Sequence, residues 1–246
     1  MPSKIYSHEN SYSKKDLASI IHRNRLKLII KTIRQYTNSK NLSWADFGCS
    51  NGFIIDEVKK KSGVNFSKII GYDSSNELIN LAKEKSISNT KFKLFDMNKN
   101  NIPSSNYDLV TCFETLEHVG NPIKAFENLF QHLNSRGVLF ITMPNETGMI
   151  GFIKFVGRYF LRRNPYGDFF NSTSKIKYGI NLLMKKPIAD FRLKDQLSYG
   201  PHLGFEYKSL EETINKNYVK TNYLKLINKR FTVFYSNVVF IYKKMV

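Results

Sequence analysis

The amino-acid sequence predicts a doubly wound α/β protein, a mostly parallel sheet with helices on both faces and an antiparallel end. Three observations predict it. Short apolar runs alternate with helical stretches between residues 42 and 143, a glycine-bordered turn follows the first run, and two β-rich runs come last. We expect a single domain, because no low-complexity linker and no internal repeat divides the 246 residues.

Hydrophobic periodicity places the elements in order. Residues Lys14–Tyr36 predict a long helix, because apolar side chains recur at helical spacing. The expected strands are Leu42–Phe47, Lys68–Asp73, Lys91–Asp96, Tyr107–Phe113 and Val138–Met143, and the expected helices between them are Phe53–Lys61, Asn76–Lys85 and Pro122–Leu133. Strands and helices that alternate in this way favour βαβ units and a parallel sheet.

The last part of the chain has a different pattern. Val219–Asn228 and Thr232–Lys243 are consecutive β-rich runs joined by the link Lys229–Phe231, which predicts an antiparallel hairpin. Along the chain we therefore expect four parts. They are an N-terminal helical region (1–42), a core (43–146), an insertion (147–200), and a C-terminal helix with the hairpin (201–246).

The composition excludes several classes of protein. Nineteen Phe and fourteen Tyr among 41% hydrophobic residues exclude general disorder. No apolar run approaches the roughly 18 residues of a membrane-spanning helix. The polar start of the chain lacks a secretory signal, and two cysteines cannot form a disulfide framework. These observations predict a cytoplasmic protein.

The net charge of +18 is unevenly distributed. Residues 1–42 carry +7, 43–146 carry −1, 147–200 carry +7 and 201–246 carry +5, so the core is close to neutral. A coat that binds nucleic acid would not normally spare the middle of the chain. Two interpretations stay open: a lysine-rich composition from AT-rich coding, and a basic face for anionic partners or a membrane surface.

A glycine-bordered turn follows the first expected strand, in the segment Asp46–Gly52. In an open α/β sheet the ligand crevice lies beyond the carboxyl ends of the strands. Gly48 and Gly52 let the backbone approach a ligand closely. The spacing is G-x-x-x-G rather than G-x-G-x-x-G, and a carboxylate two residues before Gly48 disfavours a pyrophosphate. The turn therefore favours a ligand without phosphates.

Two further acids end the next strands. Asp73 closes the second expected strand, where a carboxylate suits the two hydroxyls of a ribose. Asp96 and Met97 close the third, where they can accept from an adenine amino group and lie along its ring. Each acid alone is more typical of a cap or turn, but three at successive strand ends favour a shared site.

These residues resemble the cofactor motifs of class I S-adenosylmethionine-dependent methyltransferases. The glycine turn, Asp73, the Asp96 turn and the run Tyr107–Val119 carry the resemblance, which covers about residues 40–146. It implies a Rossmann-like fold with a seven-stranded sheet whose last strand is antiparallel. It also implies that S-adenosyl-L-methionine is the cofactor and S-adenosyl-L-homocysteine the product.

The resemblance implies a role for individual residues. Gly48, Cys49 and Gly52 shape the methionine side of the pocket, and Asp46 receives the methionine amino group. The cofactor-binding set is completed by Asp73 at the ribose, Asp96 and Met97 at the adenine, and Ser74 and Phe113. Ser74 departs from the family, which often has an apolar adenine contact there, and this puts the cofactor affinity in doubt.

Glu114, Glu117 and His118 follow the fourth expected strand at spacing i, i+3, i+4, which would place them on one helix face. The local sequence is similar to the quinone-biosynthesis O-methyltransferases, in which an acidic pair and a His are associated with a divalent metal. Mg²⁺ held there would polarise an acceptor hydroxyl. In the alternative that we favour, no metal binds, Glu117 caps a helix and His118 packs against the cofactor.

The expected catalytic residues are His118, His202 and Glu114. His202 opens a loop-to-helix junction, and a His at that place can deprotonate an acceptor hydroxyl. The sequence does not decide between His118 and His202 as the general base. Positioning supplies much of the rate, because the sulfonium is already activated.

The insertion contains a basic amphipathic helix, Met149–Leu161, with Lys154, Arg158 and Arg162 in one stripe. It suits a lid whose cations face solvent or an anionic substrate, or a peripheral membrane contact through residues 149–163 whose cations meet headgroups. Lys175–Phe191 predicts a second lid element.

The function predicted is methylation of a hydroxyl on a small molecule, a sugar or glycan precursor, or a lipid or quinone. We expect no stable nucleic-acid complex. The alternatives are an RNA methyltransferase, a nicotinamide-dependent oxidoreductase, which the glycine spacing disfavours, and a binding module without activity.

Overall fold

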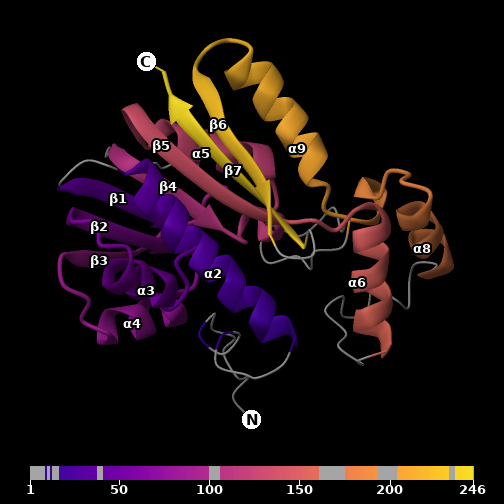
Figure 1. Cartoon of the computed structure of the whole chain (residues 1–246), viewed down its shortest axis with the longest axis horizontal. Helices are drawn as coiled ribbons and strands as arrows, with labels where there is room; N and C mark the ends of the chain where they lie inside the picture. Colours follow the sequence, from indigo (N-terminus) through magenta and orange to yellow (C-terminus); the bar gives the residue numbers. More distant parts are fainter. Residues whose placement is uncertain are drawn as a thin grey trace.

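The computed structural model describes residues 9, 12, 17–37, 41–99, 106–160, 175–192, 204–232 and 236–245. Seven strands form one sheet in the order β3-β2-β1-β4-β5-β7-β6 (Figure 1). The strands are β1 (Leu42–Phe47), β2 (Phe66–Asp73), β3 (Thr90–Leu94), β4 (Tyr107–Phe113), β5 (Leu133–Pro144), β6 (Leu224–Phe231) and β7 (Asn237–Lys244). The first five are parallel, whereas β7 runs antiparallel to both β5 and β6. The predicted fold class is confirmed.

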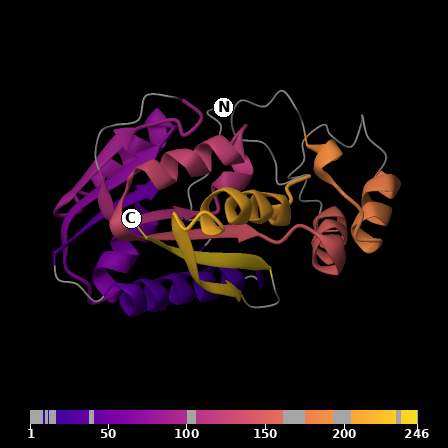
Figure 2. The same cartoon turned by 90° about the horizontal axis from the view of Figure 1, so that it is seen from above.

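Helices cover both faces of the sheet (Figure 2). One face packs against α2 (Leu17–Tyr36), α3 (Phe53–Lys61) and α4 (Asn76–Glu84), through a cluster that includes Ile29, Ile55 and Ile79. The other face packs against α5 (Pro122–Gln131) and α9 (Tyr207–Ile214), through a cluster that includes Phe126 and Leu210. Asn121 caps α5 by accepting from the Lys124 amide at 3.0 Å, and Pro122 takes the first helical position.

Several elements have the bounds that the sequence predicts, namely β1, β4 and α3. The predicted hairpin exists, but its bounds were wrong. Asn215–Val219 forms a π-helical turn after α9, and β6 begins only at Leu224. Lys229–Phe231, the predicted link, belongs to β6 and pairs with Val238–Phe240. Polar residues are tolerated there because β6 is the edge strand of the sheet.

The insertion between β5 and α9 forms a separate helical layer beyond the end of β5 (Figure 1). It contains α6 (Gly148–Phe160), α8 (Lys175–Leu183) and a short 3-10 turn at Ala189–Phe191. Its own small core joins Tyr178, Leu182, Ile188 and Phe191 with aromatic side chains of α6. Because β5 is parallel to β4, α6 starts at the carboxyl edge of the sheet.

The basic stripe of α6 does not face outward as expected. Lys154 and Arg158 both bind the buried Glu146 carboxylate, at 3.2 Å and 2.7 Å. Their side chains point inward because a buried carboxylate needs a counter-charge. Arg162, the third residue of the predicted stripe, lies outside the described residues. Among the helices that the structure describes, none is long and apolar enough to cross a membrane.

Candidate active site

A crevice opens at the carboxyl ends of β1, β2 and β3. It is lined by Phe47, Gly48, Tyr72, Asp73, Ser74, Phe95, Asp96, Met97, Asn98, Thr115, His118 and Val119. Parallel strands end at the same edge, so segments far apart in the sequence meet there. Of the twelve lining residues, Gly48, Asp73, Ser74, Asp96, Met97 and His118 are predicted site residues.

The glycine turn forms the floor of this crevice. Gly48 has φ +79, and the Gly48 and Cys49 amides both donate to the Tyr72 carbonyl, at 2.8 Å and 2.9 Å. A Cβ on Gly48 would collide with the Thr115 side chain. Glycine is therefore required there for its backbone conformation and for space. Ser50 also adopts a positive φ, of 51°, at the tip of the turn.

Asp73 connects the turn after β1 to the turn after β2. Its Oδ2 accepts from the Ser50 amide at 2.8 Å and its Oδ1 from the Ser75 amide at 2.9 Å. Burial raises the pKa of Asp73, although the backbone amides of Ser75, Ser50 and Ser74 counteract the rise. The carboxylate therefore lines the crevice and also holds together the two turns that border it.

Asp46 lies beneath the turn and is only 2% exposed. Its Oδ1 accepts from the Thr111 hydroxyl at 2.6 Å, and the Thr111 hydroxyl oxygen in turn accepts from the Trp44 indole at 2.8 Å. Burial raises the pKa of Asp46 to about 7, with a smaller contribution from the Asp73 charge. The carboxyl is thus poised to ionise beside a cation, because an opposite charge favours the ionised form.

The residues predicted to hold the adenine, Asp96 and Met97, lie in a tight turn after β3. Asp96 Oδ1 accepts from the Asn98 amide at 2.9 Å and from the Asn98 side chain at 3.1 Å. The Met97 carbonyl accepts from the buried Asn128 side chain. These hydrogen bonds therefore fix the backbone from which the Asp96 and Met97 side chains reach the crevice.

Besides the buried Asp46, three further predicted cofactor residues are absent from the lining of the crevice. Gly52 precedes α3 at φ +74, and a Cβ there would meet the Phe92 ring. Cys49 is buried, and burial raises the pKa of its thiol. Phe113 packs edge-to-face on Phe140 with ring centroids 5.0 Å apart. These three residues stabilise the turn or pack in the core and do not line the crevice.

Glu114 does not share a helix face with Glu117 and His118, so this prediction was wrong. Its φ of 51° is incompatible with a right-handed helix, and only Leu116–His118 forms a short 3-10 turn. Glu114 Oε2 forms a buried ion pair with Arg25 Nη1 at 2.9 Å and also accepts from the Asn237 amide group. Glu114 is therefore held by α2 and β7.

Glu117 and His118 have different surroundings, one buried and the other partly exposed. Glu117 is fully buried, and neither carboxylate oxygen has a hydrogen-bond partner among the described residues. Burial, together with the Glu114 charge, raises the pKa of Glu117 well above its usual value. His118 lines the crevice, its side chain is 32% exposed, and its Nε2 lies 3.9 Å from Glu117 Oε1.

The described residues do not fit a resident divalent metal. They contain no group of three or more His, Cys, Asp or Glu side chains that could surround one ion. Glu114 is neutralised by Arg25, and the raised pKa of Glu117 opposes the ionised form that a hard cation needs. His202, the other expected base, lies outside the described residues.

Sequence reasoning missed several residues around the site. Thr115 covers Gly48, and Arg25 pairs with a carboxylate 89 residues further along. Glu9 accepts from the Asn51 side chain at 3.0 Å and from Lys85 at 2.7 Å, so this residue contacts both the glycine turn and the end of α4. Helical periodicity gives no signal for such pairs, because it reports burial and not the identity of the partner.

Comparisons with known proteins identify the family of the chain. A family model described as a methyltransferase domain matches residues 10–178. A ubiquinone biosynthesis O-methyltransferase of Actinobacillus pleuropneumoniae is 26% identical over 183 residues, which are 71% of this chain and 76% of that protein.

Two solved structures share the fold. Magnesium protoporphyrin IX methyltransferase from Synechocystis, crystallised with bound SAH, has a TM-score of 0.61 at 12% identity, over 96% of this chain and 92% of that one. A SAM-dependent methyltransferase from Aquifex aeolicus has a TM-score of 0.56 at 14% identity, over 95% and 100%.

The strand order, the antiparallel β7 and the crevice at the strand ends define a class I S-adenosylmethionine-dependent methyltransferase. Since the family model covers more than half of its length, the chain belongs to the methyltransferase-domain family.

Proposed function

We propose that the protein transfers the methyl group of S-adenosylmethionine to a hydroxyl of a small-molecule acceptor. The observation that carries the proposal is the crevice, in which Asp73, Asp96 and His118 converge beside Gly48. Acids at successive strand ends suit an adenosyl ligand, and the close approach at Gly48 suits a ligand lying on the backbone. The relative named a ubiquinone biosynthesis O-methyltransferase supports a hydroxyl as the acceptor.

The cofactor residues take distinct roles in this proposal. Asp73 accepts from the ribose hydroxyls, and Asp96 and Met97 hold the adenine. Gly48 leaves room for the methionine moiety, and Asp46 stabilises its positive charge from below the turn. Cys49 and Gly52 shape the same turn, while Ser74 borders the adenosyl group.

The acceptor side needs a base and a fixed approach. When bound, the cofactor supplies an activated methyl group and its own leaving group, S-adenosylhomocysteine. His118 takes the proton of the acceptor hydroxyl at the crevice, while the oxygen lone pair forms the new bond to carbon and the carbon–sulfur bond breaks. His202 is proposed as the alternative base. Glu114 acts through its ion pair with Arg25, which fixes the chain before His118.

The insertion is proposed to shape the acceptor end of the crevice. Arg192 Nη2 donates to the Glu117 and Val119 carbonyls, at 3.0 Å and 2.8 Å, on both sides of His118. A peripheral membrane contact through residues 149–163 belongs to the same proposal, and it suits an acceptor such as a lipid or quinone precursor. A sugar or glycan precursor is the other acceptor class that we propose.

Calorimetry tests the cofactor first. We expect S-adenosylmethionine and S-adenosylhomocysteine to bind and NAD to give no heat. Hydroxyl-bearing acceptors, including catechols and polyprenyl phenols, are then compared with matched amines for formation of S-adenosylhomocysteine. Binding of NAD alone would reject the methyl-transfer proposal, and product formation only with amines would reject O-methylation.

His118→Ala tests the base. We expect turnover to fall by about 10²–10⁴-fold, the usual contribution of general-base catalysis, with little change in cofactor affinity. His132→Ala is unsuitable as a control because His132 is buried in the core, and His22→Ala is unsuitable because His22 lies 3.0 Å from Arg25. Lys83→Ala, at an exposed position of α4, serves instead. Wild-type turnover of His118→Ala would exclude His118 as the base and leave His202.

A further inference from the structure

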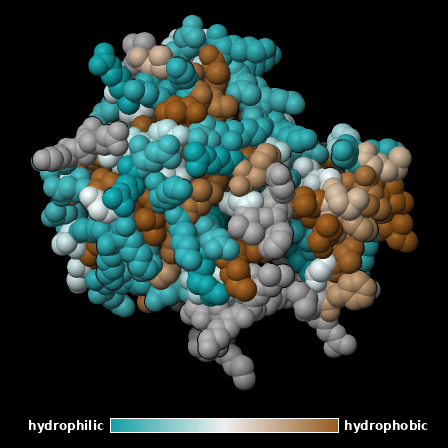
Figure 3. All heavy atoms as spheres, in the orientation of Figure 1, coloured by the Kyte–Doolittle hydropathy of each residue, from teal (hydrophilic) through white to brown (hydrophobic). Residues whose placement is uncertain are grey.

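The outer sides of α6 and α8 form an exposed apolar surface at one end of the molecule (Figure 3). Seven of the thirteen large apolar side chains that are exposed among the described residues belong to these helices or the residue after them. They are Met149, Ile153, Phe160, Ile176, Ile180, Leu183 and Met184. We call this set the α6–α8 surface.

The spacing aligns these residues into two stripes. Met149, Ile153 and Phe160 recur at i, i+4 and i+11, and Ile176, Ile180 and Leu183 at i, i+4 and i+7, so each set lies on one face of its helix. Phe160 is 77% exposed and Ile176 is 75% exposed. The opposite faces already fill the small core around Tyr178 and Leu182. Burial against the other residues that the structure describes therefore does not account for the outer stripes.

Buried ion pairs fix which face of α6 points outward. Lys154 Nζ reaches Glu146 and the carbonyls of Asn145 and Ser236, at 3.0 Å and 2.6 Å for the two carbonyls. Arg158 binds both Glu146 oxygens, at 2.7 Å and 2.8 Å. Turning α6 over would leave the Glu146 carboxylate buried without a counter-charge, which is strongly unfavourable. The outward apolar stripe is thus a consequence of the packing beneath it.

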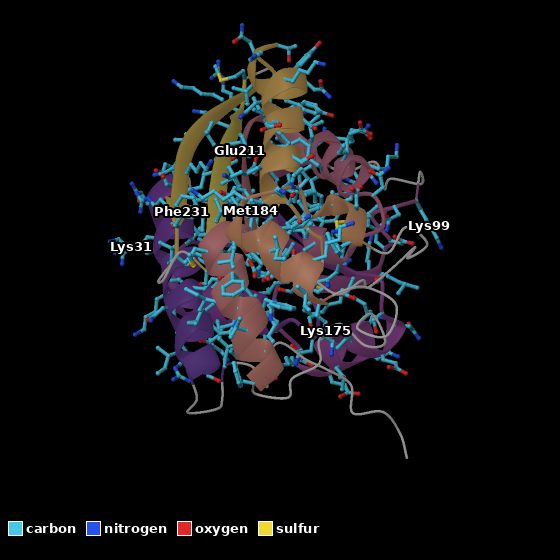
Figure 4. All side chains as sticks on the ribbon, turned by 90° about the vertical axis from the view of Figure 1, so that its right-hand side faces the viewer. Lys31, Lys99, Lys175, Met184, Glu211 and Phe231 are labelled. Carbon is cyan, nitrogen blue, oxygen red and sulfur yellow. The ribbon has the colours of Figure 1, made fainter. Side chains whose placement is uncertain are left out.

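Lysines border the stripe of α8. Lys175 and Lys177 lie at its start, and Lys185 and Lys186 follow its end; all four are exposed. Figure 4 looks onto this end of the molecule and shows Lys175 and Met184 at opposite ends of α8. Asp190 is the one exposed acid among the described residues 175–192. Apolar side chains flanked by lysines are typical of helices that lie in the interface of an anionic bilayer.

We propose that the α6–α8 surface docks on the headgroup region of an anionic lipid bilayer. A second copy of the chain is a poorer occupant, because each copy carries a net charge of +18 and the same lysines would face each other. Arg192 links the insertion to the carbonyls beside His118, so docking would set the crevice close to the bilayer. The docking deepens the membrane contact of the proposed function and rests on that proposal, and the position of the crevice rests in addition on methyl transfer there.

Sedimentation with vesicles tests the docking. The purified chain is mixed with vesicles that contain phosphatidylglycerol and, separately, with vesicles of phosphatidylcholine alone. We expect binding to the anionic vesicles that weakens in high salt. Ile153→Gln/Ile176→Gln leaves the net charge unchanged and is expected to lower the partition coefficient about tenfold or more, because two apolar contacts are lost. Lys185→Gln/Lys186→Gln is expected to weaken binding to anionic vesicles only.

Ile123→Gln is the matched control, since Ile123 is an exposed isoleucine on α5, and it should bind vesicles like the wild type. Thermal unfolding confirms that each variant folds. Wild-type chain that stays in the supernatant, or equal binding by the Ile153/Ile176 variant, would reject the docking surface. A dimer that the same variant converts to a monomer would assign the surface to a second copy. Calorimetry with S-adenosylmethionine is run in parallel, so that failure of docking is distinguished from failure of methyl transfer.

Discussion

Asp46 is a buried acid that suits a cationic ligand, but its burial lowers the stability of the ligand-free protein when the carboxyl is ionised. Its carboxyl is surrounded by the strand ends and has one hydrogen-bond donor, the Thr111 hydroxyl. Burial raises its pKa to about 7, so near neutral pH the protein holds a carboxyl that readily gains or loses its proton. A ligand with a positive charge would favour the ionised form, and cofactor binding should release protons below pH 7.

The same pKa makes stability depend on pH in a defined direction. In the unfolded chain an Asp has a pKa of about 3.9, so between about pH 4 and pH 7 the folded protein binds the extra proton. The free energy of unfolding therefore falls as pH rises through this window, by on the order of 4 kcal/mol. Asp46→Asn cannot ionise and should be more stable than the wild type at pH 8, with the difference closing near pH 4. Urea unfolding at both pH values measures this, and parallel pH curves for the two proteins would contradict the raised pKa.

Asp73 holds two turns together, and we propose that it also accepts from the ribose. Asp73→Ala would leave both the Ser50 and the Ser75 amide without an acceptor, whereas Asp73→Asn keeps an acceptor oxygen for one of them and is the milder change. We expect Asp73→Asn to weaken S-adenosylmethionine binding by about 1–3 kcal/mol, the scale of hydrogen bonds to a charged group. Calorimetry measures the affinity, and Asp56→Asn on α3 is the control away from the crevice. Unchanged affinity in Asp73→Asn would exclude the ribose role.

At the scale of elements, the turn after β1 depends on a glycine for two separate reasons. Gly48 and Gly63 both have positive φ values, of 79° and 70°. A Cβ at Gly63 would meet nothing within 4 Å, whereas a Cβ at Gly48 would strike Thr115. Gly63 is therefore a natural control, because it shares the backbone conformation without the crowding.

We expect Gly63→Ala to lower the free energy of unfolding by about 1 kcal/mol, the cost of the left-handed conformation alone. Gly48→Ala should cost about 2–4 kcal/mol and also prevent cofactor binding, since Thr115 must move into the crevice. Urea unfolding and calorimetry measure the two effects. Equal losses of stability in both variants would show that the contact with Thr115 is unimportant.

The elements that the sequence predicts best have sharp boundaries. The bounds of β1 are marked by the glycine turn, and α5 begins at a capping Asn followed by Pro. The C-terminal hairpin was placed wrongly, because β-rich residues continue from the π-helical turn into β6 and polar residues lie within the edge strand. Periodicity cannot locate a boundary where the composition does not change.

The candidate site was predictable to the extent that local sequence specifies it. Acids at strand ends and glycines in a turn are local signals, and Asp73, Asp96 and Gly48 do meet in the crevice. The surroundings of Glu114 were not predictable, because they depend on a positive φ and on partners in α2 and β7. The inward stripe of α6 depends in the same way on a buried carboxylate at Glu146.

At the scale of the whole molecule, one ion pair joins segments that are distant in the sequence. Glu114, after β4, binds Arg25 of α2 and Asn237 of β7. The pair is buried, so removal of the cation leaves a carboxylate without compensation, which typically costs about 3–5 kcal/mol. The pair also holds the backbone that leads to His118.

Arg25→Met is expected to lower the free energy of unfolding by about 3–5 kcal/mol, and Arg25→Met/Glu114→Gln should recover much of this loss. Lys60→Met breaks the exposed pair with Asp56 on α3 and should leave stability unchanged. Chemical unfolding of the three variants measures the contrast. A loss no larger in Arg25→Met than in Lys60→Met would show that the buried pair does not stabilise the fold.

The position of β7 constrains how the chain matures during translation. Although β7 follows β6 in the sequence, it lies between β5 and β6 in the sheet. Until residues 237–244 have left the ribosomal tunnel, the edge of β5 remains open, β6 has no neighbour to pair with, and Glu114 lacks its Asn237 partner. A nascent chain arrested before that point would expose an unpaired strand edge to other chains, a typical starting point for aggregation.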